Sequence, residues 1–181
     1  VLGGGRGKMN VDHLDDLGSL AVPCDPTLFG AEETVLRCRL WREEEDRQDP
    51  GAALDFIREH FRQSYDRVLA GTFAAYRQFP LWDVWMGDGR ESVRLDFAAK
   101  EELHPYIGRA SIDLALWDGE KFLWALAFGG TENRLSIEHG LCAVFEGERL
   151  EALVDHTDFP SIVQWWEWYK ADNILTGIPS V

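Results

Sequence analysis

The sequence contains no long apolar run and few cysteines. No stretch of about 18 or more apolar residues occurs and no signal-peptide pattern is found, so we expect neither a membrane span nor secretion. The three cysteines, Cys24, Cys38 and Cys142, include no Cys-x-x-Cys pair, which excludes the common zinc and redox motifs. We therefore expect a cytoplasmic protein in which the Cys38 and Cys142 thiols are buried and free.

Basic residues are also in the minority. The chain has 18 Lys and Arg against 32 Asp and Glu among 181 residues, a formal charge of −14, which excludes an ordinary basic nucleic-acid-binding protein. Apolar residues make up 45% of the chain and aromatic residues 12%, too much for a disordered acidic tail. We interpret residues 1–8, which precede Met9 and lack hydrophobic periodicity, as an expression linker, and residues 9–181 as one domain.

The spacing of apolar residues predicts one long helix. Between residues 52 and 79 they recur every three or four positions, which places them on one face. Asp49 is suited to cap the first turn, Pro50 to open the helix and Pro80 to end it. Gly71 lies inside this run and is expected to loosen or bend the helix.

Alternating apolar residues predict strands on both sides of that helix. The expected strands are residues 34–41, 92–97, 111–117, 122–128, 141–145 and 149–154. Asp118-Gly119 predicts a tight hairpin turn between two of them, since this dipeptide tolerates positive φ angles. A second hairpin is expected around Glu146-Gly147-Glu148.

The order of these elements indicates an α+β fold. We expect an antiparallel sheet of about five to six strands, arranged in a meander of hairpins and packed against the long helix. Residues 10–33 show little periodicity and predict only a short element followed by a loop. Residues 160–170 predict a C-terminal helix, with Asp158 as its N-cap.

The standard enzyme signatures are missing. The chain has no Gly-x-Ser-x-Gly elbow, no His-Glu-x-x-His helix and no phosphate-binding loop. Glu138 and His139 enter a strand, where adjacent side chains point to opposite faces, so they act on one atom only if a bulge turns them. A structural role is the simpler interpretation. His156 is a further candidate ligand, but Thr157 and Asp158 beside it suit a turn and cap.

Aromatic residues gather in the expected C-terminal helix. Helical spacing places Trp165, Trp168 and Tyr169 on one side, with Trp166 about 100° away. This is more aromatic surface than a narrow core stripe requires. Exposed tryptophans commonly anchor protein interfaces, whereas buried ones would close the core beneath the sheet. Both interpretations stay open.

A longer pattern covers the last third of the chain. From residue 112 to residue 153 it runs strand, turn, strand, then Glu-His-Gly-Leu at 138–141, opening a hairpin whose second strand is Arg-Leu-Glu-Ala-Leu at 149–153. This pattern resembles a group of small uncharacterised bacterial α+β proteins, some of which are similar to immunity proteins encoded beside secreted toxins. The resemblance implies a toxin-like partner and no particular catalytic residue.

Our leading hypothesis is a non-enzymatic, immunity-like binding protein whose acidic and aromatic surface docks a basic protein partner. We expect no cofactor or metal, no direct nucleic-acid binding and no membrane association. The candidate contacts are Glu43, Glu44, Glu45, Asp46, Trp165, Trp166, Trp168 and Tyr169. Three alternatives stay open: a small metal-dependent hydrolase using Glu138, His139 and His156, mimicry of nucleic acid by the acidic surface, and a charge that serves solubility alone.

Overall fold

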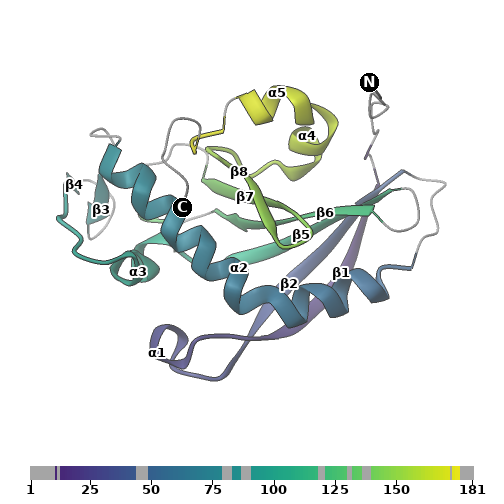
Figure 1. Ribbon diagram of the computed structural model, residues 1–181, viewed down its shortest axis with the longest axis horizontal. Coiled ribbons are helices and arrows are strands. Elements are labelled where there is room, and N and C mark those ends of the chain that lie inside the picture. The colour runs from purple at the N-terminus through teal and green to yellow at the C-terminus, as the bar shows by residue number, and fades with distance from the viewer. Residues whose placement is uncertain are drawn as a thin grey trace.

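The computed structural model describes residues 11, 13–43, 49–78, 83–86, 91–117, 121–129, 132–135, 140–171 and 173–175. It confirms the α+β fold class (Figure 1). A six-stranded sheet carries the long helix on one face and short C-terminal helices on the other. The interpretation of residues 1–8 as a linker falls outside the described residues.

The main sheet has the strand order β1-β2-β5-β6-β7-β8. Its strands are β1 (His13–Pro23), β2 (Glu33–Arg42), β5 (Ala110–Trp117), β6 (Lys121–Phe128), β7 (Leu141–Glu146) and β8 (Arg149–Val154). The expected β5–β6 and β7–β8 hairpins are both confirmed as antiparallel pairs. The pair β2–β5 is parallel, because the chain between these strands crosses back over the sheet through the long helix. Residues 118–120, at the first hairpin turn, are not among the described ones.

The first strand is longer than the sequence predicts. Where we expected a short element and a loop, β1 extends over 11 residues and pairs with β2 from His13 to Pro23. The register shifts between Asp16 and Gly18, and Gly18 has a φ of 79°. This bulge interrupts the alternation of inward and outward side chains, so the two-residue period does not reveal the strand.

The strand predicted at 92–97 is also wrong in extent. Two short strands, β3 (Val84–Met86) and β4 (Glu91–Val93), form a separate two-stranded sheet, and residues 94–97 are not strand. Leu95 packs against the core instead. The Tyr76 hydroxyl accepts the Leu95 backbone N–H at 3.0 Å and donates to its carbonyl at 3.1 Å. The Tyr76 side chain therefore satisfies the two backbone groups of Leu95 that a neighbouring strand would otherwise bond.

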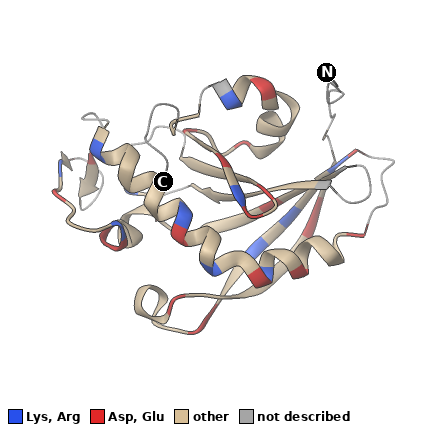
Figure 2. Ribbon diagram, viewed as in Figure 1, with Lys and Arg blue, Asp and Glu red and all other residues tan. Residues whose placement is uncertain are grey.

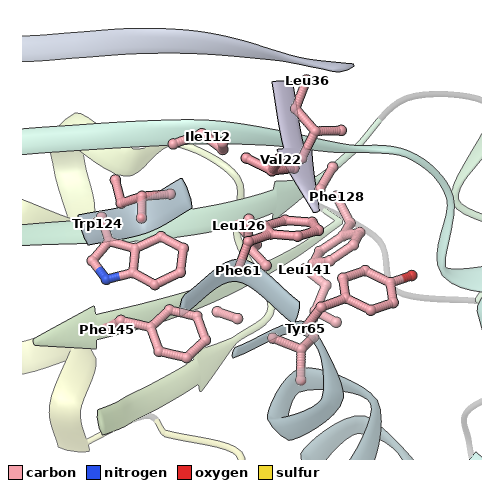
Figure 3. Close-up of a cluster of buried hydrophobic side chains, with 14 of the residues drawn as sticks. Val22, Leu36, Phe61, Tyr65, Ile112, Trp124, Leu126, Phe128, Leu141 and Phe145 are labelled. Carbon is pink, nitrogen blue, oxygen red and sulfur yellow. The ribbon is translucent and has the colours of Figure 1, made fainter. Parts of the chain in front are cut away.

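The long helix α2 (Gly51–Gln78) confirms the predicted amphipathic run. Asp49 accepts the Gly51 backbone N–H at 3.0 Å, as expected of a capping residue. Acidic and basic residues are interspersed along this helix (Figure 2). On its buried side Phe61 and Tyr65 pack into the sheet core (Figure 3). Short elements α1 (Pro26–Phe29), η1 (Lys100–Leu103) and α3 (His104–Ile107) lie before β2 and β5.

The opposite face of the sheet is divided between apolar and polar halves. Helices α4 (Phe159–Gln164) and α5 (Trp166–Ala171) pack on the β6–β8 half. The half formed by β1, β2 and β5 carries polar side chains, among them Arg37, Arg39 and Asp113. All three cysteines are buried and free, which confirms the expectation for Cys38 and Cys142.

The chain returns to the outer edge of the sheet at residues 173–175. The Asn173 side chain accepts the Leu153 backbone N–H at 2.9 Å and donates to the Glu151 carbonyl at 3.0 Å, both on β8. Ile174 donates to the Leu153 carbonyl at 2.9 Å. Leu175 then reaches α2, where its Cδ2 lies 3.2 Å from the place a Cβ on Gly71 would occupy. Gly71 thus admits this segment to the helix surface.

No helix among the described residues is both long and apolar enough to cross a membrane.

Candidate functional site

The predicted C-terminal helix is divided at Trp165, and its aromatic rings differ in exposure. Trp165 has φ −112° and ψ 35°, which ends α4 before α5 begins. Trp165 and Trp168 are 53% and 59% exposed, whereas Trp166 and Tyr169 are only 7% and 8% exposed. The expectation that Tyr169 shares a side with Trp165 and Trp168 is therefore wrong. Trp168 and Tyr169 are adjacent on α5 and point about 100° apart, so Tyr169 faces the core together with Trp166, three residues before it, while Trp168 faces the solvent.

The two buried rings fix α5 to the protein. Trp166 and Tyr169 pack in one apolar cluster with Phe159 and Ile162 of α4 and with side chains of β6 to β8. Trp168 stands edge-on against Tyr169, with ring centroids 4.8 Å apart. The exposed pair Trp165 and Trp168, which we call the tryptophan surface, therefore projects from an anchored base. Trp166 and Tyr169 are buried in the core, which leaves Trp165 and Trp168 as the rings that face the solvent.

The acidic candidates are described only in part. Glu43 follows β2 and is exposed, whereas Glu44, Glu45 and Asp46 lie outside the described residues. Beside the tryptophan surface, the Glu167 side chain is 77% exposed and lies 2.9 Å from Lys170. The charges visible along α2 are of both signs (Figure 2). The described acids therefore do not gather on the helix as a single acidic stripe.

The candidate hydrolase residues are not brought together by the described part of the chain. Glu138 and His139 fall outside it. His156 Nδ1 accepts the Asp158 backbone N–H at 2.9 Å, and its ring stands edge-on to Tyr169 at 5.6 Å between centroids. His156 thus holds the turn before α4, where Asp158 accepts the Ser161 hydroxyl at 2.7 Å. Among the described residues no group of three or more His, Cys, Asp or Glu is placed to hold a metal ion.

A hollow of about 450 Å³ opens beside the end of α1, the middle of α2 and the start of α3. We call it the ring hollow; it is lined by Phe29, Leu36, Phe61, Tyr65, His104 and Arg109, among others. Tyr65 Oη lies 2.7 Å from His104 Nδ1. The imidazole also bonds the Leu28 backbone carbonyl, so Nδ1 is the acceptor and the phenol donates.

Burial sets the protonation states of this pair. Removal from water raises the pKa of Tyr65 far above its usual range and lowers the pKa of His104, with the Leu28 hydrogen bond opposing the second effect. Both side chains are therefore neutral near pH 7. The sequence offered no signal for this pair, since Tyr65 reads as one more apolar position of α2 and His104 lies in an irregular segment.

A second hollow of about 550 Å³ lies on the polar half of the sheet. We call it the arginine groove; its lining includes Arg37, Arg39, Arg109, Ser19, Ser111 and Thr157. Arg37 pairs with Asp16 at 2.8 Å and Arg39 with the buried Asp113 at 2.6 Å. Arg109, Ala110 and Glu132 line both this groove and the ring hollow. The two hollows therefore meet at Arg109.

Comparison with known proteins assigns no family. No family model matches the chain, and no curated protein or solved structure matches it significantly. The resemblance to immunity-like proteins thus stays a prediction.

These surfaces differ in the chemistry they offer. The tryptophan surface presents two large rings to the solvent, which suits contact with another macromolecule. The ring hollow is concave, aromatic and neutral at its inner end, with Arg109 at its rim. That combination suits a small molecule that carries one charged group.

Proposed function

We propose that this chain is a non-enzymatic, cytoplasmic, immunity-like protein that binds a basic protein partner through the tryptophan surface. The observation that carries the proposal is the exposure of Trp165 and Trp168 above an anchored α5. Two tryptophans that are each more than half exposed, so close together, form an apolar patch of the kind that interfaces bury.

Rigid aromatic anchors bind efficiently. A tryptophan has only two rotatable side-chain bonds, so burying it at an interface costs little conformational entropy for the area removed from water. The base is already fixed, because Trp166 and Tyr169 pack in the core. Residues of this type are enriched among those whose truncation costs about 2 kcal/mol or more of binding free energy.

The charge of the chain favours a basic partner. A formal charge of −14 attracts a cationic surface, raises the rate of encounter and disfavours acidic competitors. Glu167, exposed between the two tryptophans in sequence, places a carboxylate paired with Lys170 beside the tryptophan surface. Glu43 and its acidic neighbours Glu44, Glu45 and Asp46 are proposed as further contacts.

The experiment is affinity capture from the source cell with three purified baits. The wild-type chain is compared with the double variant Trp165→Ser/Trp168→Ser and with Trp85→Ser, a matched control that removes a 38% exposed tryptophan from β3. We expect a basic protein to be captured by the wild type and by Trp85→Ser, and to be lost with the double variant. Capture should weaken between about 0.05 M and about 0.3 M salt.

Two outcomes would contradict the proposal. One is that the wild type and the double variant capture the same proteins. The other is that the captured protein is acidic or that its binding is insensitive to salt, because charge then plays no part in recognition. Urea unfolding of each bait establishes that the substitutions leave the fold intact.

A further inference from the structure

We propose that the ring hollow binds a small organic anion, with its apolar body among the rings and its anionic group at Arg109. The proposal does not depend on the tryptophan surface, which is a separate site formed by α4 and α5.

The inner end of the ring hollow is built from rings that support one another. Phe29 stands edge-on to Tyr65 at 5.0 Å and to His104 at 4.7 Å between centroids. Phe61 stacks beside Tyr65 at 5.8 Å. These contacts give preformed aromatic walls, and a hollow of about 450 Å³ lies within the range of small-molecule sites.

The polar groups at this inner end are already satisfied. The Tyr65 hydroxyl donates to His104 Nδ1, and the imidazole bonds the Leu28 carbonyl. A charged ligand group placed here would lose water and meet only neutral side chains, which is unfavourable. The inner end therefore selects the uncharged, apolar part of a ligand.

The rim supplies the charge. Arg109 is exposed and donates to the Val35 carbonyl. The parallel pairing of β2 with β5 begins only at Cys38 and Ile112. The Val35 carbonyl therefore lies outside this pairing, and Arg109 lies next to the start of β5. Within the described part of the chain, no carboxylate forms an ion pair with Arg109.

Neighbouring charges narrow the choice of ligand. Arg37 and Arg39 also face the adjoining groove, but Asp16 and Asp113 neutralise them at 2.8 and 2.6 Å. Glu132 lines both hollows and repels negative charge near Arg109, so a doubly charged ligand is disfavoured more than a singly charged one. The structure therefore favours a ligand with one anionic group, and Arg109 is the cation that receives it.

The test uses four probes that share one aromatic ring and differ in charge. Phenylacetate and phenyl phosphate are anions, benzyl alcohol is neutral and phenethylamine is a cation. Binding is followed by the NMR signals of the Tyr65 and His104 rings and by calorimetry. We expect at least one anion to shift both signals, and the neutral and cationic probes to bind about tenfold more weakly or worse. The stronger of the two anions distinguishes a carboxylate ligand from a phosphate ligand.

Two variants separate the charge from the fold. Arg109→Gln should weaken binding of the anions about tenfold or more and leave benzyl alcohol unaffected. Arg149→Gln removes a 73% exposed arginine from β8 and should change nothing. Unshifted Tyr65 and His104 signals in the probe-free variant establish that the hollow is intact.

The proposal is overturned by any of three results. The first is that no probe shifts the two ring signals at concentrations up to about 10 mM. The second is that phenethylamine or benzyl alcohol binds as tightly as the anions. The third is that Arg109→Gln binds the anions as well as the wild type does. Because the readout is local to α2 and α3, each result is independent of whether a protein partner docks at α5.

Discussion

Arg39 on β2 donates two parallel hydrogen bonds to the Asp113 carboxylate on the neighbouring strand β5. Arg39 Nε lies 2.7 Å from one carboxylate oxygen and Nη2 lies 2.6 Å from the other. The Asp113 side chain has no exposed surface, and Trp41 Nε1 donates a third hydrogen bond at 3.1 Å. Burial raises the pKa of Asp113, and the Arg39 guanidinium opposes that rise. The buried carboxylate therefore depends on its partner.

Loss of Arg39 alone should destabilise the protein strongly. Arg39→Met leaves an unpaired buried carboxylate, and we expect the free energy of unfolding to fall by about 3–5 kcal/mol in urea titrations. The control is Arg37→Met, whose ion pair with Asp16 is exposed on both sides and is worth about 0–1 kcal/mol. Arg39→Met/Asp113→Leu should recover most of the loss. Equal effects of Arg39→Met and Arg37→Met would show that burial does not matter here.

A methyl group at Gly140 should be poorly tolerated. Gly140 has a φ of 83°, and a Cβ there would lie 2.6 Å from both the Phe128 carbonyl oxygen and Thr157 Cγ2. Gly140→Ala therefore adds a clash to backbone strain, and we expect a loss of about 2 kcal/mol or more by thermal unfolding. Gly147→Ala is the control, since φ is 58° and no atom lies within 4 Å. If both variants lose the same stability, the clash is relieved by local movement.

Stability should fall as the pH drops below about 6.5, and His104 should cause part of that fall. In the unfolded chain His104 takes up a proton at its ordinary pKa of about 6.5, whereas burial keeps it neutral to lower pH in the folded protein. The unfolded state then binds more protons, so its free energy is lowered relative to the folded state as pH falls through this window. The free energy of unfolding is measured by urea titration at several pH values between about 7 and about 5. It should fall less steeply with decreasing pH for His104→Gln than for His156→Gln. If the free energy of unfolding depends on pH equally in the two variants, protonation of His104 does not contribute to the loss of stability.

The two kinds of tryptophan should respond differently to truncation. Trp166→Ala empties part of the cluster beneath α5 and should cost about 3–5 kcal/mol. Trp168→Ala removes a ring that is 59% exposed and should change stability by no more than about 0.5 kcal/mol. Thermal unfolding of the two variants is the measurement. A large loss for Trp168→Ala would mean that its edge contact with Tyr169 supports the core.

The sequence predicted those elements whose side chains follow a regular period. The apolar rows of α2, β5, β6, β7 and β8 repeat every 3.6 or two residues, and their bounds agree with the prediction to within a residue or so. Where the period is interrupted, the prediction failed. The bulge at Gly18 concealed β1, and the non-helical φ and ψ of Trp165 divide the expected single terminal helix into α4 and α5.

The candidate sites were less predictable than the fold because they depend on contacts between distant residues. Tyr65 and His104 are 39 residues apart and meet only when α2 and α3 pack together. The candidate role of Arg109 depends on where the pairing of β2 with β5 begins, and no local sequence pattern encodes that point. Exposure of Trp165 and Trp168 was one of two open interpretations, and the packing of α5 decided it.

The side-chain amide of Asn173 has a consequence for self-association. By occupying the backbone groups of Glu151 and Leu153, it denies that border of the sheet to an incoming extended chain, which would otherwise use the same groups as a template. At the opposite border β1 carries Asp15, Asp16 and a bulge, features that resist templated growth by charge and by shape. Edge-to-edge strand pairing between native molecules is thus hindered at both edges of the sheet, by different features.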